Sequence, residues 1–297
     1  MKKILVTGAS GFIGRECIRL LKLKNFKIHA ISSKDVDEYE SDHINWHKVN
    51  LTDKEQIHNV FKKVKPEYLL HLAWNVSNKQ YNSNQHYVWV KIGIDLLEAF
   101  SHFGGKRLVV AGTCAEYDWT DGYCYEKETP LKPQNTYGVS KHALQLLINS
   151  FSKQNQLSYA WGRIFFAYGP GENPNSLIPF VVKNLKEGKN VEISHGNFIR
   201  DYIFIEDIAN AFVSLVDSQI EGPVNISSGS PSKIKDIVLK IAKQFDKEHL
   251  VKFSDKELAE NDYPCIVGDN SLLLKELNWK PKIGLEEGLK RTIQSLI

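Results

Sequence analysis

Residues 3–14 read Lys-Ile-Leu-Val-Thr-Gly-Ala-Ser-Gly-Phe-Ile-Gly, and this stretch decides the fold class. Lys3–Thr7 has the composition of a short buried strand, and Phe12–Leu23 has the spacing of an amphipathic helix. The glycines at positions 8, 11 and 14 allow a tight turn and let backbone N–H groups approach a pyrophosphate, whose charge the helix N-terminus stabilises. A glycine turn between the first strand and the first helix therefore predicts a dinucleotide site.

Short apolar runs and longer amphipathic stretches alternate along the following residues. Further strands are predicted at Lys27–Ile31, Ile44–Val49, Tyr68–Ala73, Arg107–Ala111 and Tyr159–Ile164, and helices at Lys54–Lys63, Val88–Phe103, Tyr137–Lys153, Leu177–Glu187, Ile205–Leu215, Ile234–Phe245 and Leu285–Ile293. This alternation predicts an α/β fold with a doubly wound parallel sheet of the Rossmann type. The stretch Tyr168–Asn175 is rich in Gly, Pro and Asn, and it predicts a boundary after residue 167.

The composition excludes several classes of protein. The chain has 297 residues, of which 42% are hydrophobic and 25% charged, as in ordinary globular proteins. A net charge of +3 with interspersed acids predicts no nucleic-acid partner. The four cysteines lack Cys-x-x-Cys spacing and no predicted helix carries a His-x-x-x-His pair on one face, so neither a metal site nor a disulfide framework is predicted. No apolar run suits a signal peptide or the roughly 18 residues of a membrane span, which predicts a cytoplasmic protein without membrane contact.

The residues after the second predicted strand bear on the choice between NAD(H) and NADP(H). An acid at this place would bind the adenine ribose hydroxyls of NAD. The sequence instead has Ser32, Ser33 and Lys34, whose hydroxyls and cation suit the 2′-phosphate of NADP, and Arg15 adds a second charge. NADP(H) is therefore favoured, and NAD(H) is the alternative if Asp35 binds the ribose.

The remaining residues predicted to bind the cofactor lie in the glycine turn and at the ends of the third and fourth strands. Asn50 and Leu51 are expected to flank the adenine, and Leu72 and Ala73 to line the path to the nicotinamide. The full set from these turns is Gly8, Ser10, Gly11, Phe12, Ile13, Gly14, Arg15, Ser32, Ser33, Lys34, Asn50, Leu51, Leu72 and Ala73.

A second informative stretch, residues 133–141, reads Pro-Gln-Asn-Thr-Tyr-Gly-Val-Ser-Lys. Tyr137 and Lys141 are four residues apart and share one face of a helix. A free tyrosine titrates near about pH 10, and a nearby ammonium favours the phenolate, so this pairing predicts an acid–base tyrosine. Lys141 can also hold the nicotinamide ribose. Thr113 follows the fifth strand, at the sheet edge where ligands bind, so Thr113, Tyr137 and Lys141 are predicted to be catalytic.

Five motifs in this order resemble the extended short-chain dehydrogenase/reductase family, in its nucleotide-sugar epimerase/dehydratase branch. They are Thr7-Gly-x-x-Gly-x-x-Gly14, Tyr137-x-x-x-Lys141, Arg163–Gly171, Arg200-Asp-Tyr-Ile203 and Leu277-Asn-Trp-Lys-Pro281. The resemblance implies an NAD(P)-binding Rossmann domain over residues 1–167, onto which residues of about 203–228 pack back. It implies a smaller C-terminal substrate-binding lobe over 168–297, a nucleoside-diphosphate sugar as substrate, and a homodimer formed through the helices Val88–Phe103 and Tyr137–Lys153.

Departures from the family pattern narrow the predicted reaction. Cys114 and Ala115 stand where the dehydratases carry Asp-Glu, which argues against 4,6-dehydration, and Ala115 stands where epimerising GDP-fucose-synthase-like enzymes carry Cys. The main prediction is NAD(P)H-dependent reduction of the 4-keto group of a nucleotide-linked 4-keto-6-deoxyhexose, because the serine–lysine turn suits NADPH. The alternatives are a nucleotide-sugar 4-epimerase with tightly bound NAD and a non-catalytic cofactor-sensing protein on the same fold.

The resemblance also implies substrate contacts. Besides Thr113, Arg200 is expected to bind the diphosphate through its planar fork of donors, with an ion pair to Asp201 as the alternative. Asn175 and Leu177 are expected to offer backbone amides to the same diphosphate.

Further positions depart from the family pattern. Phe166 replaces a common Asn and is expected to form an apolar wall beside the nicotinamide. Many relatives carry a diphosphate-binding Arg near residues 260–262, where this chain has only Ala259. Trp89 replaces another common Asn.

Overall fold

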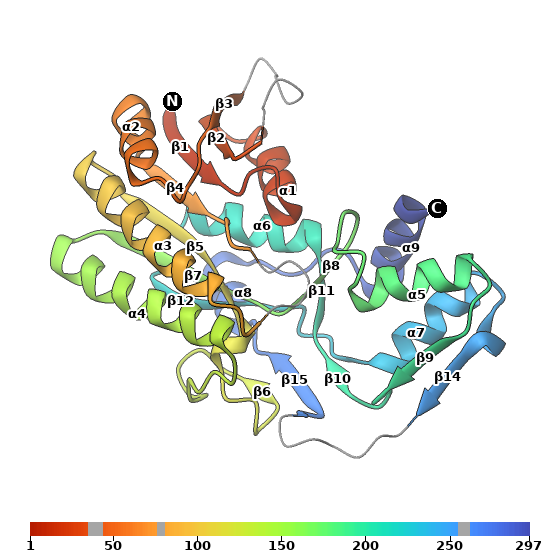
Figure 1. Ribbon diagram of the computed structural model, residues 1–297. Coiled ribbons are helices and arrows are strands. Elements are labelled where there is room, and N and C mark those ends of the chain that lie inside the picture. Colours follow the sequence, from red (N-terminus) through yellow and green to blue (C-terminus); the bar gives the residue numbers. More distant parts are fainter. Residues whose placement is uncertain (35–43, 76–80, 255–261) are drawn as a thin grey trace. The chain divides into compact units, whose positions relative to one another are not determined.

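The computed structural model describes residues 1–34, 44–75, 81–254 and 262–297, and these form two compact units (Figure 1). The first unit comprises Met1–Glu116, Leu131–Arg163 and Ala209–Val224, and the second comprises Tyr117–Pro130, Ile164–Ile208 and Asn225–Ile297. The chain therefore passes between the units several times, whereas the sequence analysis drew one main boundary after residue 167. That one unit binds the cofactor and the other the substrate stays a prediction.

A seven-stranded sheet forms the centre of the first unit, in the order β12-β7-β5-β4-β1-β2-β3. Its strands are β1 (Lys2–Thr7), β2 (Phe26–Ser32), β3 (Ile44–Lys48), β4 (Tyr68–His71), β5 (Arg107–Thr113), β7 (Ser158–Ile164) and β12 (Gly222–Ile226). Parallel pairing joins β3 to β2, β2 to β1, β1 to β4 and β4 to β5. The strand order reverses between β1 and β4, so the prediction of a doubly wound parallel sheet is confirmed.

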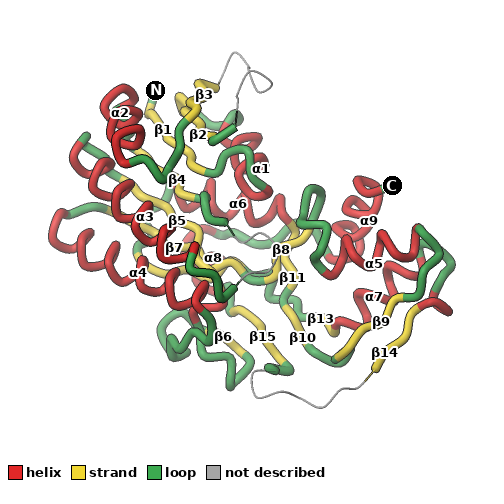
Figure 2. Tube along the Cα trace, in the orientation of Figure 1, coloured by secondary structure: helices red, strands yellow, loops and turns green. Residues whose placement is uncertain are grey.

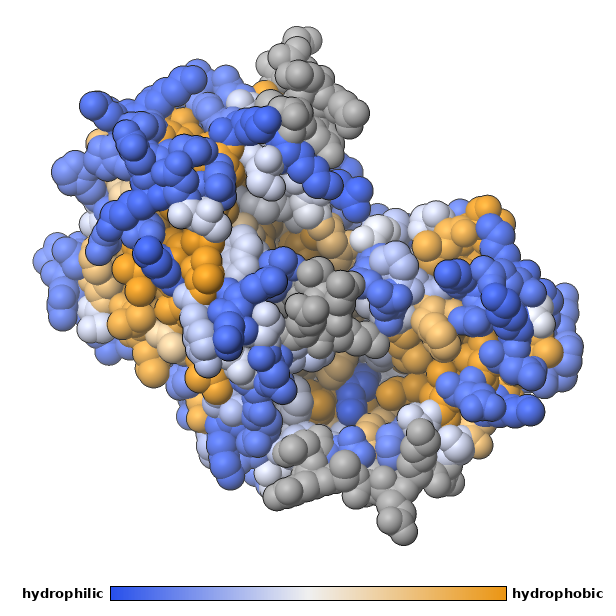
Figure 3. Space-filling model, in the orientation of Figure 1, coloured by the Kyte–Doolittle hydropathy of each residue, from blue (hydrophilic) through white to orange (hydrophobic). Residues whose placement is uncertain are grey.

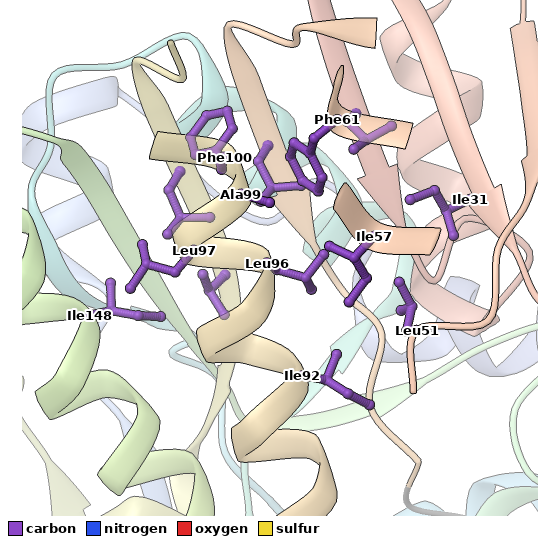
Figure 4. Close-up of a cluster of buried hydrophobic side chains, with 14 of the residues drawn as sticks. Ile31, Leu51, Ile57, Phe61, Ile92, Leu96, Leu97, Ala99, Phe100 and Ile148 are labelled. Atoms are coloured by element: carbon purple, nitrogen blue, oxygen red, sulfur yellow. The ribbon is translucent and has the colours of Figure 1, made fainter. Parts of the chain in front are cut away.

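Three helices cover one face of this sheet, and α1 (Phe12–Leu21) lies on the other (Figure 1). The three are α2 (Lys54–Val64), α3 (Gln85–His102) and α4 (Thr136–Asn155). Their apolar residues form one buried cluster with the strands, in which Phe61 of α2 packs edge-on against Phe100 of α3 (Figure 4). Each buried phenyl ring contributes about 2–3 kcal/mol to folding stability, so this cluster holds the three helices against the sheet.

Short strands and helices build the second unit, as Figure 2 shows in yellow and red. The strands are β6 (Tyr123–Cys124), β8 (Phe166–Tyr168), β9 (Val191–Ser194), β10 (Ile199–Arg200), β11 (Tyr202–Phe204), β13 (Ser232–Lys233), β14 (Val251–Ser254) and β15 (Cys265–Gly268). The helices are α5 (Leu177–Lys186), α7 (Ile234–Lys243), α8 (Ser271–Leu277) and α9 (Leu285–Leu296), and α6 (Ile205–Val216) runs from the second unit into the first. None of these strands was predicted by its range from the sequence, because two to four residues do not establish an alternating pattern.

A buried carboxylate joins three segments of the second unit. Asp201 accepts hydrogen bonds from the backbone N–H groups of Ser228, Gly229 and Gly268 and from the Ser228 hydroxyl. Burial raises the pKa of Asp201, although these hydrogen bonds act in the opposite direction. The carboxylate is thus satisfied without an ion pair to Arg200, the alternative considered from the sequence.

Membrane spans and metal-ligand clusters are both absent from the described residues. No helix in the described ranges combines the length and apolar composition needed to cross a bilayer. Within the part of the chain that the structure describes, no three His, Cys, Asp or Glu side chains cluster as metal ligands.

A histidine pair lies near the β3 edge of the sheet. His29 Nδ1 and His47 Nε2 are 2.9 Å apart, and the two rings stack. Burial, the neighbouring His47 and nearby lysines lower the pKa of His29 to about 4, and burial together with Lys63 lowers that of His47. The folded chain therefore holds this pair uncharged at pH values where an unfolded chain binds protons.

The His29–His47 pair predicts that the folded state loses stability as the pH falls. Between pH 6.5 and 4 only the unfolded chain protonates His29, so its contribution to stability is present above pH 6.5 and is lost as the pH falls. As the pH falls through this window, the free energy of unfolding of the wild type should decrease by about 1.4 kcal/mol per pH unit more than that of His29→Gln. Urea unfolding at several pH values measures both slopes. The control is His58→Gln, at an exposed position on α2, which should leave the dependence of the unfolding free energy on pH close to that of the wild type. Equal slopes in wild type and His29→Gln would contradict the prediction.

Candidate active site

The glycine turn joins β1 to α1 with almost no free space. Gly8 has φ +68°, which favours glycine, and an added Cβ would lie 2.7 Å from the backbone N of Ala73. A Cβ on Gly14 would lie 2.0 Å from the Gly8 carbonyl oxygen, and the Gly11 N–H donates to that same oxygen at 3.0 Å. Among the described residues no side chain caps α1, so its first N–H groups are available to an anion. The turn fits a dinucleotide pyrophosphate.

The serine–lysine turn after β2 is partly engaged in its own hydrogen bonds. The buried Ser32 hydroxyl accepts the N–H of Lys34 at 3.1 Å and lies 3.4 Å from the Ser10 hydroxyl. Ser33, Lys34 and Arg15 are exposed. The preference for NADP(H) therefore depends on these three exposed residues and stays a prediction. Asp35, the residue considered for NAD, lies outside the described residues.

The ends of β3 and β4 differ in their relation to the glycine turn. Leu72 and Ala73 follow β4, and their N–H groups donate to the carbonyl and hydroxyl of Thr7 at 3.2 and 3.4 Å, next to Gly8. Leu51 lies in the apolar core, and the Asn50 side chain accepts from Thr52. The structure thus brings Leu72 and Ala73 to the turn, whereas contact of Asn50 and Leu51 with an adenine stays a prediction.

Thr113 and Tyr137 are brought together by close packing of α4 on the loop after β5. A Cβ on Gly138 would lie 2.2 Å from the Ala115 carbonyl oxygen, so glycine is required for this approach. The Thr113 hydroxyl accepts the N–H of Ala115 at 3.2 Å, and the Thr113 side chain lies near enough to the Tyr137 phenol to lower its pKa. Because one lone pair of the hydroxyl is used, its hydrogen is available for the phenol oxygen.

Lys141 is buried, and its burial favours the uncharged amine over the ammonium. Its Nζ donates to the Ala111 carbonyl at 2.6 Å and lies 3.9 Å from the centre of the Trp74 ring. Burial lowers the pKa of Lys141 to about 7. Burial raises the pKa of Tyr137 above its ordinary value, and the nearby Thr113 side chain opposes this. The lowering of the Tyr137 pKa that the sequence predicted is therefore outweighed by burial.

An aromatic cluster around Tyr137 is the part of this site that sequence analysis missed. Trp74, Tyr81 and His86 place their ring centres 6.3, 5.8 and 5.3 Å from that of Tyr137. Trp74 Nε1 donates to His86 Nδ1 at 3.1 Å, and Trp89 stacks on Trp74. The stack explains Trp89, for which the sequence offered no reason. The position of Trp74, directly after Leu72 and Ala73 at a strand end, was a signal that could have identified it.

In the second unit, Arg200 of β10 lies between two aromatic rings. Its guanidinium carbon is 5.5 Å from the centre of the Phe166 ring and 5.0 Å from that of Phe198, and Nη1 donates to the Ile199 carbonyl at 2.8 Å. Phe166 is paired with Tyr202 across β8 and β11. The replacement of Asn by Phe at position 166 therefore supplies a ring for Arg200, and a contact of Phe166 with a nicotinamide stays a prediction.

The other predicted substrate contacts lie around the start of α5. The backbone N–H of Asn175 donates to the side chain of Asn173 at 2.9 Å, so this amide is already engaged. Leu177 is the first residue of α5, where helical N–H groups have no partner within the helix. Ala259, Glu260 and Asn261 lie outside the described residues.

The doubly wound sheet, the glycine turn and the Thr–Tyr–Lys set at the strand ends define a short-chain dehydrogenase/reductase class of protein. Residues 4–227 match the pattern of the NAD dependent epimerase/dehydratase family, and the chain belongs to this family. The resemblance inferred from the five motifs is thus confirmed.

Relatives and solved structures agree with this assignment. The chain is 27% identical to UDP-glucuronate 4-epimerase of Thermodesulfobacterium geofontis, over 97% of this chain and 94% of that protein. It is 27% identical to GDP-6-deoxy-D-talose 4-dehydrogenase of Aggregatibacter actinomycetemcomitans, over 93% and 91%. The structure of UDP-glucose 4-epimerase of Thermus thermophilus in complex with NAD has the same fold, with a TM-score of 0.86, 23% identity and coverage of 99% and 98%.

Proposed function

We propose that the chain oxidises and reduces C4 of a nucleoside-diphosphate sugar, as a 4-epimerase that retains NAD. The observation that carries the proposal is the buried Tyr137 phenol on α4, with Lys141 one turn along the same helix and the Thr113 side chain near enough to lower the Tyr137 pKa, in a chain of the NAD dependent epimerase/dehydratase family. A 4-epimerase relative matched over nearly the whole chain and a 4-epimerase fold neighbour with NAD support it. This reverses the order of the two reactions given by sequence analysis, which placed the reductase first.

The second candidate is NAD(P)H-dependent reduction of a nucleotide-linked 4-keto-6-deoxyhexose. The exposed Ser33 and Lys34 favour it, as does the relative named GDP-6-deoxy-D-talose 4-dehydrogenase. The internal hydrogen bonds of Ser32 weaken the argument for a 2′-phosphate, which is why this reaction stands second. A non-catalytic cofactor-sensing protein has less support, because the family is enzymatic and Thr113, Tyr137 and Lys141 are all present.

The chain's residues supply the proton chemistry. When bound, the nicotinamide accepts or donates the hydride, and the glycine turn with Leu72 and Ala73 would hold the dinucleotide. Tyr137 Oη removes the proton of the sugar C4 hydroxyl in oxidation and returns a proton to the carbonyl oxygen in reduction. The Thr113 hydroxyl donates to the same oxygen. Lys141, with a pKa of about 7, carries a positive charge in part of the population at neutral pH and then favours the Tyr137 phenolate.

The substrate's nucleotide requires groups that bind phosphate. Arg200 would supply a planar guanidinium for the diphosphate, and the rings of Phe166 and Phe198 restrict its orientation. The N–H groups at the start of α5, from Leu177 onward, would add backbone donors.

One assay separates the two candidate reactions. The purified protein is incubated with UDP-hexoses, and separately with NADH or NADPH and a panel of nucleotide-linked 4-ketosugars. Interconversion of C4 epimers without net change in the reduced-nicotinamide absorbance supports the epimerase. Stoichiometric consumption of reduced cofactor with a ketosugar supports the reductase instead. Failure of both reactions contradicts the proposed function.

We also propose that the chain forms a homodimer through α3 and α4. Apolar side chains are exposed on both helices, and Figure 3 shows apolar atoms over this region. They are Tyr87, Val88, Val139, Leu146 and Leu147. Burial of these side chains by a second copy would remove apolar surface from water, which favours association.

Light scattering tests this dimer. We expect twice the chain mass of 33.9 kDa at micromolar concentration, and the single-chain mass for the double variant Leu146→Glu/Leu147→Glu. Leu23→Glu, a charge placed on an exposed leucine after α1, is the matched control and leaves the dimer intact. A single-chain mass for the wild type would contradict the proposal.

A further inference from the structure

Glu116 is a completely buried carboxylate next to the catalytic loop. The 3₁₀ turn Cys114–Glu116 follows Thr113 and leaves the Glu116 side chain with no exposed surface. Oε1 accepts the backbone N–H of Thr113 at 2.9 Å and the indole N–H of Trp161 at 2.8 Å, and Oε2 accepts Nε–H of Arg163 at 2.9 Å. Isolated charges are costly to bury, so this carboxylate depends on all of these partners.

Trp161 fixes the same loop from the neighbouring strand. An added Cβ on Gly112 would lie 2.1 Å from Trp161 Nε1, so the indole occupies the space beside the residue that precedes Thr113. The indole both packs on the β5 backbone and donates to Glu116. Arg163, on the same strand β7 as Trp161, is also fully buried. Trp161 and Arg163, both on β7, therefore donate to the same Glu116 carboxylate and hold the end of β5 in place.

We infer that Glu116 is a positioning residue that fixes the Thr113 backbone and thereby directs the Thr113 hydroxyl toward Tyr137. The inference rests on the proposed function, in which that hydroxyl contacts the substrate oxygen. Glu116 holds the Thr113 N–H and the Ala115 N–H holds Thr113 Oγ1, so rotation of both the residue and its hydroxyl is restricted.

The charge of Glu116 has a second, electrostatic effect. It raises the pKa of Tyr137 and that of Lys141, because a nearby negative charge disfavours a phenolate and favours an ammonium. Cys114 and Tyr81 also act on Tyr137 in the same direction. Removal of the Glu116 charge should therefore lower the pKa values of Tyr137 and Lys141. The pH profile of turnover then moves to lower pH. A residue with a purely structural role would not shift this profile.

Two double variants separate the hydrogen-bond acceptor from the charge. Glu116→Gln/Arg163→Met removes both members of the ion pair but keeps an amide oxygen for the N–H groups of Thr113 and Trp161. Glu116→Leu/Arg163→Met removes the acceptor as well. Neither variant leaves a single buried charge without its partner, the situation that destabilises a fold most.

The first readout does not depend on catalysis. We expect amide hydrogen exchange at Thr113, followed by NMR, to be as slow in the Gln/Met variant as in the wild type and faster in the Leu/Met variant. Equal exchange rates in the two variants would overturn the inference. If the wild type turns over no nucleotide sugar, the proposed function fails, whereas this comparison still decides whether Glu116 holds Thr113.

The second readout is turnover of the substrate that the wild type accepts. The Leu/Met variant should lose about 100-fold in kcat relative to the Gln/Met variant, with KM unchanged, because misplacement of a reacting group by about 1 Å has this effect. The Gln/Met variant should retain kcat within a few-fold, with a profile shifted to lower pH. Equal kcat values in the two variants would overturn the inference.

A milder variant keeps the inference testable if the Leu/Met variant does not fold. Trp161→Phe removes one donor to Oε1 and leaves the ion pair in place. We expect faster exchange at Thr113 and a lower kcat with KM unchanged. Wild-type exchange together with wild-type kcat would overturn the inference.

Discussion

Turnover falls by about 10²- to 10⁴-fold when Tyr137 is replaced by Phe, the range by which a positioned acid or base accelerates a reaction. The variant keeps the ring and its contacts with Trp74, His86 and Tyr81, and it loses only the hydroxyl that moves the proton. Thr113 remains next to the substrate oxygen, but its hydroxyl is far less acidic than a phenol. The measurement is kcat on the nucleotide sugar that the wild type converts.

Binding measurements accompany this experiment. Dissociation constants of the cofactor and of the nucleotide sugar should change by less than about threefold, because the phenol oxygen is not needed to hold either nucleotide. Tyr123→Phe is the control, since it removes the hydroxyl of an exposed tyrosine in the second unit and leaves kcat unchanged. A Tyr137→Phe variant with the turnover of the wild type would contradict the assigned role.

Six of the seven strands of the doubly wound sheet were predicted from the sequence because short apolar runs alternate with long amphipathic helices, whereas β12 was not predicted. The predicted strand at Arg107–Ala111 extends in the structure to Thr113, so Thr113 lies on the strand itself. The second unit was less predictable. Strands such as β10 and β13, with two residues each, exist only through their partners, and no local pattern specifies that pairing.

The site shows a similar division between local and long-range information. Tyr137 and Lys141 lie one helical turn apart, so their spacing was readable in the sequence. The partners of Glu116 lie 45 and 47 residues further along the chain, and burial of a charged side chain leaves no periodic signal. Likewise, the low pKa of Lys141 comes from burial next to Trp74, which depends on the packing of α4 against the loop after β4.

Gly14→Ala should weaken dinucleotide binding. The new methyl group would lie 2.0 Å from the Gly8 carbonyl oxygen and 2.8 Å from the Ala9 Cα, both of them backbone atoms that cannot rotate away. The first turn of α1 must therefore move from the end of β1, and its N–H groups lose the position required by a pyrophosphate. A distortion of about 3 kcal/mol corresponds to a rise of roughly a hundredfold in the dissociation constant.

Calorimetric titration with NAD and with NADPH measures this loss, and it also compares the two cofactors on the wild type. Gly284→Ala is the matched control, because this glycine precedes α9 with φ −66° and no described atom lies within 4 Å of an added Cβ. It should bind both dinucleotides like the wild type. Since the clash in Gly14→Ala lies within the turn that the fold itself requires, its unfolding free energy should fall together with its affinity. Wild-type affinity in Gly14→Ala would mean that the dinucleotide does not bind at the start of α1, and the proton chemistry of Tyr137 would then need a different hydride partner.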